Sequence, residues 1–254
     1  MNRKGPLMSP GIARLLVIIA LLALWEVGAR LYADPLFLCP PSQAVQALPH
    51  ILTDPKILNA IRITVYEVLT AFVMAVICGM AIGLAVGLNG FTKQSILPVI
   101  LLLYATPQAT ILPLFILSFG IGPAAKIAFG FSHGIFPVIV TVVAGVQNLK
   151  PSLLTAAKSM GASRWQIFTT IIFPHMIPSF FTGMRLGMTA VLLGVLLAEL
   201  YVSTAGIGFF TRLFAESFSP PDLFALISVL ATIAVVLNEG CRTAERRFSR
   251  WHTA

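Results

Sequence analysis

Four ionisable side chains lie inside long apolar runs of the sequence, where a charged group needs a functional or structural explanation. They are Glu67, Arg185, Glu199 and Glu239. A charged group at membrane depth is costly and usually faces a cavity or a partner. Arg185 and Glu199 are separated by nearly four helical turns, about 21 Å, so they share a helix face without pairing directly. We expect Arg185 to pair with Glu239 and hold a helix bundle together; contact with an anionic solute stays open as the alternative.

A second polar group surrounds a proline in the middle of an apolar run. Tyr104, Thr106 and Gln108 place hydroxyl and amide groups beside Pro107, which removes a backbone hydrogen bond. They either line a path for a polar solute or only satisfy the backbone groups that the proline frees. With Arg185 and Glu199, these three residues form the predicted set of translocation-path or gating residues.

Enzymatic chemistry is not predicted. The sequence contains no HExxH motif and no CxxC pair, and its lone histidines have no acidic neighbours at ligand spacing, so no catalytic residue and no metal site are expected. The G-x-x-x-x-G-K-[ST] phosphate loop is missing as well. This chain is therefore not expected to hydrolyse ATP by that mechanism.

The composition indicates the elements that must position these residues. Of the 254 residues, 57% are hydrophobic and only 10% are charged, too few to cover the surface of a soluble domain. Apolar runs of spanning length, about 20 residues each, occur near 12 to 31, 61 to 88, 96 to 119, 122 to 146, 180 to 202 and 222 to 240. We therefore predict an all-α polytopic membrane protein with about six transmembrane helices. Kinks are expected at Pro107, Pro113 and Pro137.

The basic residues predict the orientation of these helices. The net charge of +8 does not indicate nucleic-acid binding, because the cationic residues flank the apolar runs instead of forming one basic face. With six spans and the N-terminus inside, eleven of the 17 Lys and Arg fall on the cytoplasmic side and five outside, with Arg185 in a span. The excess places both termini and the segment 147 to 179 in the cytoplasm.

Three regions follow from this pattern. Residues 1–56 hold the first transmembrane helix and an interfacial segment outside the membrane, in which Ser42 is expected to cap a short helix from 43 to 52. Residues 57–241 form the main membrane domain, with a cytoplasmic loop near 150–174. Residues 242–254 form a basic cytoplasmic tail.

Small residues recur every fourth position in the second apolar run, at Ala71, Ala75, Gly79, Gly83 and Gly87. Such a stripe lets two helices approach closely in lipid, where the hydrophobic effect does not drive association. It predicts either static packing within one bundle or a surface that slides or dimerises during transport.

The cytoplasmic segment from 151 to 174 has the pattern of a helix, a break and a second helix. Pro151 suits a first helical turn, Gly161 a left-handed residue after the helix end, and Ser163 the cap of a second helix that Pro174 is expected to stop. The first helix has an apolar face formed by Leu153, Leu154, Ala157 and Met160. It is built either for a partner that grips it or for the bilayer surface.

The cytoplasmic segment 151–174 resembles a motif of a known protein family. Two alanines, three residues, a glycine, nine residues and Ile-x-x-Pro resemble the EAA loop of bacterial ABC-importer permeases, at Ala156, Ala157, Gly161, Ile171 and Pro174. Other strings resemble the nitrate/sulfonate/taurine branch of that family, among them Tyr104-Ala-Thr-Pro-Gln, Gly161-Ala-Ser-Arg-Trp and Gly183-Met-Arg-Leu. The likeness covers roughly residues 57 to 241. Thr155 stands where the family has the glutamate that names the motif, and Phe173 replaces its usual leucine.

The resemblance implies a type I ABC-importer permease in the bacterial inner membrane. In that family the loop, here Thr155, Ala156, Ala157, Gly161, Ile171 and Pro174, docks into a cleft of the ATP-binding subunit. It also implies a second permease copy in a homodimer, an extracytoplasmic solute-binding protein, and contact with membrane lipid. No cofactor is expected in this chain, since the partner ATPase would bind ATP and Mg.

The predicted function is therefore the transmembrane permease subunit of an ATP-driven, binding-protein-dependent importer. The branch resemblance implies a small anion such as an alkanesulfonate, taurine or nitrate, and leaves bicarbonate, cyanate or a pyrimidine precursor open. An ATP-independent secondary transporter is the remote alternative, because about 250 residues is short for the usual repeated halves. An intramembrane enzyme lacks its motifs.

Overall fold

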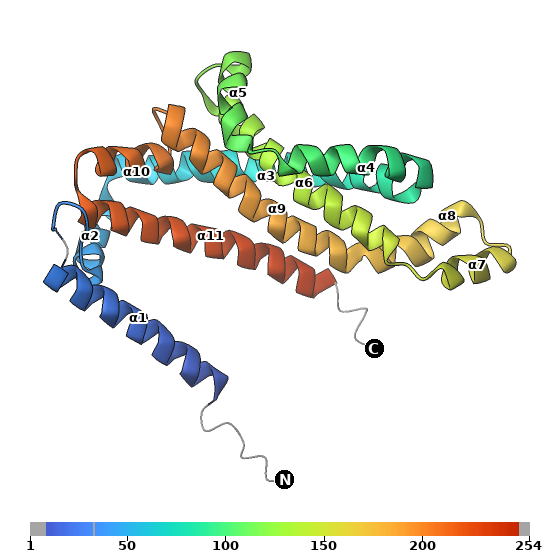
Figure 1. Cartoon of the computed structure of the whole chain (residues 1–254), viewed down its shortest axis with the longest axis horizontal. Coiled ribbons are helices and arrows are strands. Elements are labelled where there is room, and N and C mark those ends of the chain that lie inside the picture. Colours follow the sequence, from blue (N-terminus) through green and yellow to red (C-terminus); the bar gives the residue numbers. More distant parts are fainter. Residues whose placement is uncertain (1–8, 33, 249–254) are drawn as a thin grey trace, which may run out of the picture. The chain divides into compact units, whose positions relative to one another are not determined.

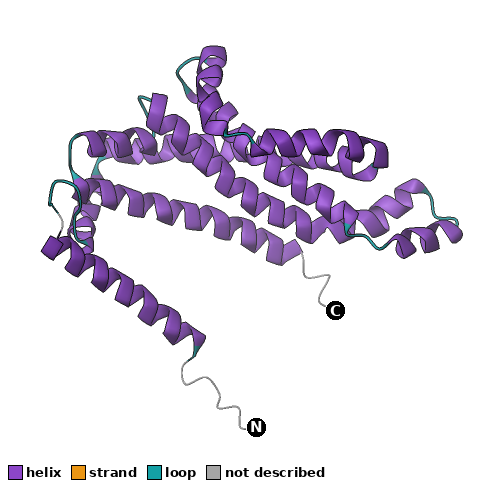
Figure 2. Ribbon diagram, in the orientation of Figure 1, coloured by secondary structure: helices purple, strands orange, loops and turns teal. Residues whose placement is uncertain are grey.

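The computed structural model describes residues 9–32 and 34–248, and the regular structure within them is helical (Figures 1 and 2). Contacts divide the chain into one unit of residues 1–58 and 210–230 and another of residues 59–209 and 231–254. Helices α3 (Pro55–Leu88), α10 (Ile207–Glu216) and α11 (Pro220–Phe248) contribute residues to both. The basic residues Arg3, Lys4 and Arg250, counted for the orientation, lie outside the described residues.

The first unit contains α1 (Pro10–Tyr32) and α2 (Pro41–Thr53). Trp25 of α1 packs on Phe224, with 5.2 Å between ring centroids. The prediction that Ser42 caps α2 is wrong, because the helix begins at Pro41, two residues before the predicted start, and its N-cap is Pro40. Ser42 instead donates from its backbone N–H and its hydroxyl to the carboxylate of Glu26, over 3.0 and 2.8 Å. Ser42 thus links α2 to the acid on α1 instead of capping its own helix.

Within residues 9–32 and 34–248, five helices are long and apolar enough to cross a membrane, and a sixth span is formed if one bent pair counts as one. The five are α1, α3, α6 (Pro123–Gln147), the helix that ends as α9 (Phe173–Val202) and α11. The bent pair is α4 (Gly90–Ala105) and the segment of η1 (Gln108–Ile111) and α5 (Leu112–Phe119). The prediction of about six spans is confirmed.

The predicted third span is broken rather than kinked, because its two parts meet at 83°. Pro107 lies at the break, where it cannot continue the ladder of α4. Pro113, predicted to kink the span, sits in the first turn of α5, where a missing N–H costs nothing. Pro137 lies inside α6, which remains a single helix through it.

The core of the second unit is built on glycine contacts between α6 and its neighbours. Gly130 and Gly194 face each other, such that a Cβ built on Gly194 would lie 3.0 Å from the Cα of Gly130. One turn further along α6, Gly134 and the carbonyl of Gly187 approach equally closely. The backbones of α6 and α9 therefore approach closely at these glycines, with valine side chains packed beside them, as small residues allow in membrane bundles.

The stripe of small residues on α3 packs against α6 of the same chain. Ala71 and Ala75 are fully buried, and Gly79 and Gly83 lie against Val138 and against another valine one turn on. This contact is intramolecular. It supports static packing over the sliding or dimerising alternative.

The loop between α6 and α9 consists of α7 (Pro151–Ser159), α8 (Arg164–Ile167) and the π-helical turn η2 (Phe168–Ile172). The prediction that Pro174 stops the second helix is wrong, since α8, η2 and α9 follow one another without a break from Arg164 to Val202. Pro174 falls within the first two residues of α9, directly after the π-helical turn, whose i→i+5 bonds leave room for a residue without an N–H. Figure 1 shows this continuity from α8 into α9.

Candidate functional site

The cytoplasmic loop predicted to contact an ATPase has the turn chemistry that its sequence indicates. At the end of α7, Ala162 N–H donates to Ala157 O and Gly161 N–H donates to Lys158 O, both over 3.0 Å. This pair of hydrogen bonds is the pattern of a Schellman cap. Gly161 has a φ of 79°, as expected of a left-handed residue. The helix, break and helix pattern is confirmed.

The second helix of the loop begins with a reciprocal cap. Ser163 accepts from Gln166 N–H, and the Gln166 side chain accepts from Ser163 N–H over 2.8 Å. Together with the glycine turn, this cap fixes the direction in which the chain leaves α7 and enters α8. The break between the two helices is therefore a defined turn.

The loop exposes large apolar side chains. Met160 is 81% exposed and Trp165 is 71% exposed, while Ala157 is buried within the chain. Thr155, at the position of the motif glutamate, is exposed and donates its hydroxyl to Pro151 O within its own helix. Ile171 is half-buried on the π-helical turn, next to Pro174. The residues predicted for coupling thus lie along one short segment, which exposes large apolar side chains among polar ones.

A buried charge cluster lies near the beginning of α6 and the end of α9, at the ends of these helices that are far from the loop. Lys126 of α6 places its Nζ 2.6 Å from Glu67 Oε1 and 4.0 Å from Glu199 Oε1. Both carboxylates are fully buried, and the lysine side chain is 7% exposed. Glu67 lies on α3 and Glu199 on α9, so the three charges connect three helices. Removing one partner of a buried ion pair strongly lowers the stability of the folded protein, because it leaves the other charge buried without compensation.

Backbone and hydroxyl groups complete the coordination of Glu199. Thr64 donates its hydroxyl to Glu199 Oε1 over 2.6 Å, and Gly208 donates its N–H to Oε2 over 2.8 Å. Gly206, with a φ of 109°, passes so close that any Cβ would overlap the Glu199 carboxylate. The turn from α9 into α10 is therefore shaped around this one acid.

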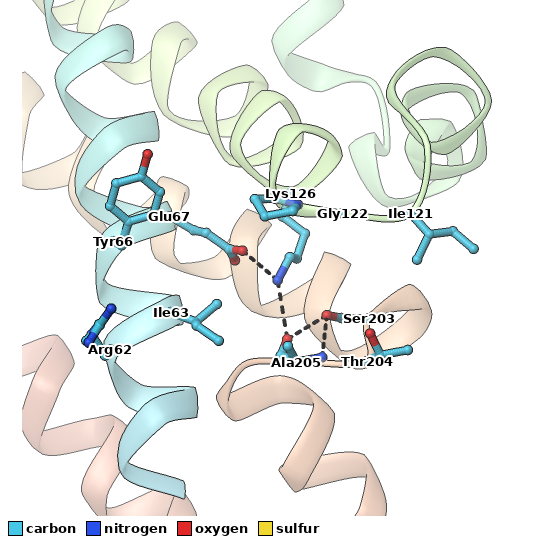
Figure 3. A pocket seen from close by; sticks show the side chains of 11 residues that line it. Arg62, Ile63, Tyr66, Glu67, Ile121, Gly122, Lys126, Ser203, Thr204 and Ala205 are labelled. Atoms are coloured by element: carbon cyan, nitrogen blue, oxygen red, sulfur yellow. Dashed lines mark hydrogen bonds and ion pairs between the residues drawn. The ribbon is translucent and has the colours of Figure 1, made fainter. Parts of the chain in front are cut away.

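The cluster borders a cavity of about 600 Å³. Figure 3 shows Glu67 and Lys126 pointing toward each other from α3 and α6, with Ala205 O accepting from Lys126 Nζ below them. Arg62 lies on the same wall as Glu67, one turn and a half earlier on α3. The cavity thus combines a buried acid, a buried lysine and an arginine.

Sequence reasoning found two members of this cluster and missed the third. Glu67 and Glu199 were identified as ionisable groups in apolar runs, and Glu199 as a candidate path residue. Lys126 was counted only as one of the cationic residues outside the membrane, although its neighbours in Pro-Ala-Ala-Lys-Ile-Ala-Phe are almost all apolar. That apolar setting was the available signal.

The predicted partner of Arg185 is wrong. Its Nη1 lies 3.5 Å from Glu245 Oε2, while Glu239 pairs with Arg242 of its own helix over 3.3 Å. The structural role expected for Arg185 between α9 and α11 is retained with a different acid. Helix α11 runs on to Phe248, past the predicted end of the span, and thereby offers a second glutamate to the arginine.

The polar group at the helix break has mixed surroundings. Thr106 donates its hydroxyl to Leu102 O over 3.0 Å, so it satisfies a backbone group of the ended helix. Tyr104 stacks on Phe136 of α6, with 5.9 Å between centroids. The Oε1 of Gln108 is buried and receives no hydrogen bond from the described residues. The two alternatives for this group therefore both remain open.

The prediction that the motifs of an intramembrane enzyme are missing is wrong for one of them, because Gly130 to Gly134 in α6 spell the GxSxG motif of hydrolases. It does not form a nucleophile elbow, because the string lies in the middle of a helix instead of at a strand-to-helix turn. Ser132 donates its hydroxyl to Phe129 O over 2.7 Å, and His133 Nδ1 lies 3.0 Å from that same carbonyl. The glycines of this string serve the packing of α6 against α9.

Comparisons with known proteins agree with this architecture. The family described as "Binding-protein-dependent transport system inner membrane component" matches residues 71–239. The taurine transport system permease protein TauC of Escherichia coli K12 is 32% identical over 90% of this chain and 85% of its own length. The putative aliphatic sulfonates transport permease protein SsuC of Bacillus subtilis 168 is 25% identical over 94% of this chain and 87% of its own.

A solved structure supports the fold independently of the sequence. The inward-facing MetNI methionine ABC transporter matches with a TM-score of 0.61 at 16% identity, over 73% of this chain and 94% of the matched chain. These observations together identify the chain as a member of the binding-protein-dependent transport system inner membrane component family, a permease subunit of an ABC importer whose ATP hydrolysis belongs to a separate subunit.

Proposed function

We propose that this permease pairs with a second copy of itself, receives a small anionic solute from an extracytoplasmic binding protein, and couples its passage to an ATPase through the loop 151–174. The relatives named for taurine and aliphatic sulfonates support the anionic solute, as does a nitrate import permease at 25% identity. The ATPase would bind ATP and Mg, and this chain would transmit the resulting motion.

The exposed apolar face of the loop carries the proposal. Leu153, Met160 and Trp165 are 47%, 81% and 71% exposed on a short segment with defined turns. Large apolar side chains gathered on one exposed surface mark a partner site. A cleft of the ATPase that receives α7 would bury these side chains, and the rigid turn at Gly161 would keep them in position.

The helix that follows the loop connects it to the charge cluster. Residues Arg164 to Val202 form one run of 39 helical residues, about 58 Å long at 1.5 Å per residue. Glu199 lies near its far end, inside the charge cluster. Displacement of α8 by the ATPase would thus be transmitted along α9 to the cluster and to the cavity beside it.

The orientation follows from the same helices. The loop joins the end of α6 to the beginning of α9, whereas the cavity lies at the beginning of α6 and the end of α9. Because the basic residues favour a cytoplasmic position for the loop and both termini, the cavity would open on the extracytoplasmic side, where a binding protein delivers its solute.

A pair of proline substitutions tests the coupling loop. Gly161→Pro is incompatible with a φ of 79°, and it removes the N–H that donates to Lys158. Gly90→Pro is the matched control, since Gly90 is the first residue of α4 and Asn89 before it is extended. Each tagged variant is purified in mild detergent, and the proteins that co-purify are identified.

We expect the ATPase to co-purify with the native chain and with Gly90→Pro, and to be lost with Gly161→Pro. If Gly161→Pro retains the ATPase and ATP-dependent uptake in liposomes, the loop is not the coupling element. If the native chain purifies alone and transports without ATP, the importer mechanism itself is wrong for this chain and a secondary transporter replaces it.

A further inference from the structure

The buried charges beside the cavity do not balance. Glu67, Glu199 and Lys126 contribute two carboxylates and one ammonium group, all in a region where the side chains are 7% exposed or less. Buried charges are tolerated when they are paired and hydrogen-bonded. The cluster becomes neutral when one of the two carboxyl groups keeps its proton or when one further positive group binds.

The place for that positive group is one oxygen of Glu67. Both oxygens of Glu199 accept hydrogen bonds, from Thr64 and from Gly208. Glu67 Oε1 faces Lys126 at 2.6 Å, but Glu67 Oε2 receives no hydrogen bond from any described residue. Glu67 is 0% exposed and is also part of the cavity wall. A buried acceptor without a donor is costly, and the cavity is the side from which a donor can reach it.

The opposite charge is available on the same wall. Arg62 lines the cavity, its side chain is exposed, and it forms none of the ion pairs found among the described residues. Its Cα precedes that of Glu67 by five residues, about 7.5 Å along the axis of α3. A guanidinium on a flexible stem binds sulfonate, carboxylate or phosphate groups through parallel hydrogen bonds.

We propose that this cavity binds a zwitterion, with a primary ammonium group at Glu67 and an anionic group at Arg62. The proposal rests on the proposed importer function and narrows its solute to a short aminoalkyl acid, such as a 2-aminosulfonate. A plain alkanesulfonate or nitrate would satisfy Arg62 but would leave the Glu67 oxygen without a donor. A zwitterion satisfies both and keeps the cluster and its ligand close to neutral.

The test compares two ligands that differ by one ammonium group. Taurine and ethanesulfonate are titrated by saturation-transfer NMR against the permease–ATPase complex in nanodiscs, without the binding protein. In the native complex we expect the dissociation constant of taurine to be lower by about tenfold or more, the value of one charge-assisted hydrogen bond. This comparison needs no variant.

Three variants assign the two ends of the ligand. Glu67→Gln, which keeps the side-chain volume, should abolish the preference for taurine while ethanesulfonate still binds. Arg62→Gln should weaken both ligands. Lys56→Gln is the control, because Lys56 is an exposed cation near the start of α3 that does not line the cavity, and it should change neither dissociation constant.

Equal binding of the two ligands by the native complex would overturn the proposal, as would a taurine preference that survives Glu67→Gln. If taurine does not bind and sodium ions alone raise the melting temperature of the native complex but not of Glu67→Gln, the cluster holds an inorganic cation and the proposal is wrong. ATPase co-purification and ATP-dependent uptake are measured separately on the native chain, so failure of this inference is distinguishable from failure of the proposed function.

Discussion

Alanine substitutions along the small-residue stripe of α3 should lower stability most where α6 leaves the least space. At Gly79, an added Cβ would lie 2.8 Å from Val138 Cβ and 3.2 Å from Ile135 O. At Gly83 the corresponding contacts are 2.8 and 3.1 Å. These neighbours are backbone atoms or the Cβ of a buried, β-branched valine, so rotation of a side chain cannot relieve the clash.

The magnitude follows from these contacts. Overpacking a filled interface costs about 1 to 3 kcal/mol, so Gly79→Ala and Gly83→Ala should each lose about 2 kcal/mol. Gly87→Ala, with its nearest contact at 3.2 Å, should change little. Gly240→Ala is the control, because nothing lies within 4 Å of its added Cβ. It should gain up to about 1 kcal/mol from helix propensity.

The assay is the free energy of unfolding from SDS titration in mixed micelles, with ATP-dependent uptake measured in parallel in liposomes. If Gly79→Ala is as stable as the native chain, the close packing of α3 on α6 is wrong. If stability is unchanged but uptake is lost, the stripe is a sliding surface and the static interpretation fails. A graded loss of stability, ordered by the contact distances, supports the packing described above.

Three further experiments test other parts of the molecule. Gly206→Ala should lower the melting temperature far more than Gly120→Ala, because both residues have positive φ but only the first would also overlap a buried carboxylate; equal losses would contradict the cluster geometry. In a double-mutant cycle of Arg185→Gln and Glu245→Gln, the coupling energy in unfolding titrations should not exceed about 1 kcal/mol, since the pair is partly exposed. Met160→Asp should reduce co-purification of the ATPase without changing the melting temperature, because this side chain has no buried contact to lose; unchanged co-purification would remove it from the docking face.

The sequence predicts the local features of this chain better than its long-range contacts. The turn at Gly161 and the cap at Ser163 follow from the preferences of single residues, and both are confirmed. Pro174 misled the prediction because its usual effect was overridden by a π-helical turn that no residue pattern announced. Local rules are reliable where the backbone alone decides the conformation.

The charge cluster shows the limit of such reasoning. Its members come from α3, α6 and α9, and nothing in the spacing of Glu67, Lys126 and Glu199 along the chain indicates that they meet. The partner of Arg185 was misassigned for a related reason, because Glu245 lies beyond the predicted span and only the relative shift of the helices brings it, and not Glu239, to the arginine. Pairing between distant helices depends on their relative shift and rotation, which a hydrophobicity pattern does not contain.

The direct backbone contact between α6 and α9 has a consequence for how this sequence can evolve. Gly194 lies against the backbone of Gly130, and Gly134 lies against the carbonyl of Gly187, while the side chains of Val191 and Val195 fill the space beside these contacts. When a larger residue arises in an ordinary core, a neighbour can become smaller in compensation. No residue is smaller than glycine, so neither member of these pairs can offset a change in the other. Substitution here is therefore expected only together with a wider separation of the two helices, which would displace the ends of α6 and α9 that hold the charge cluster.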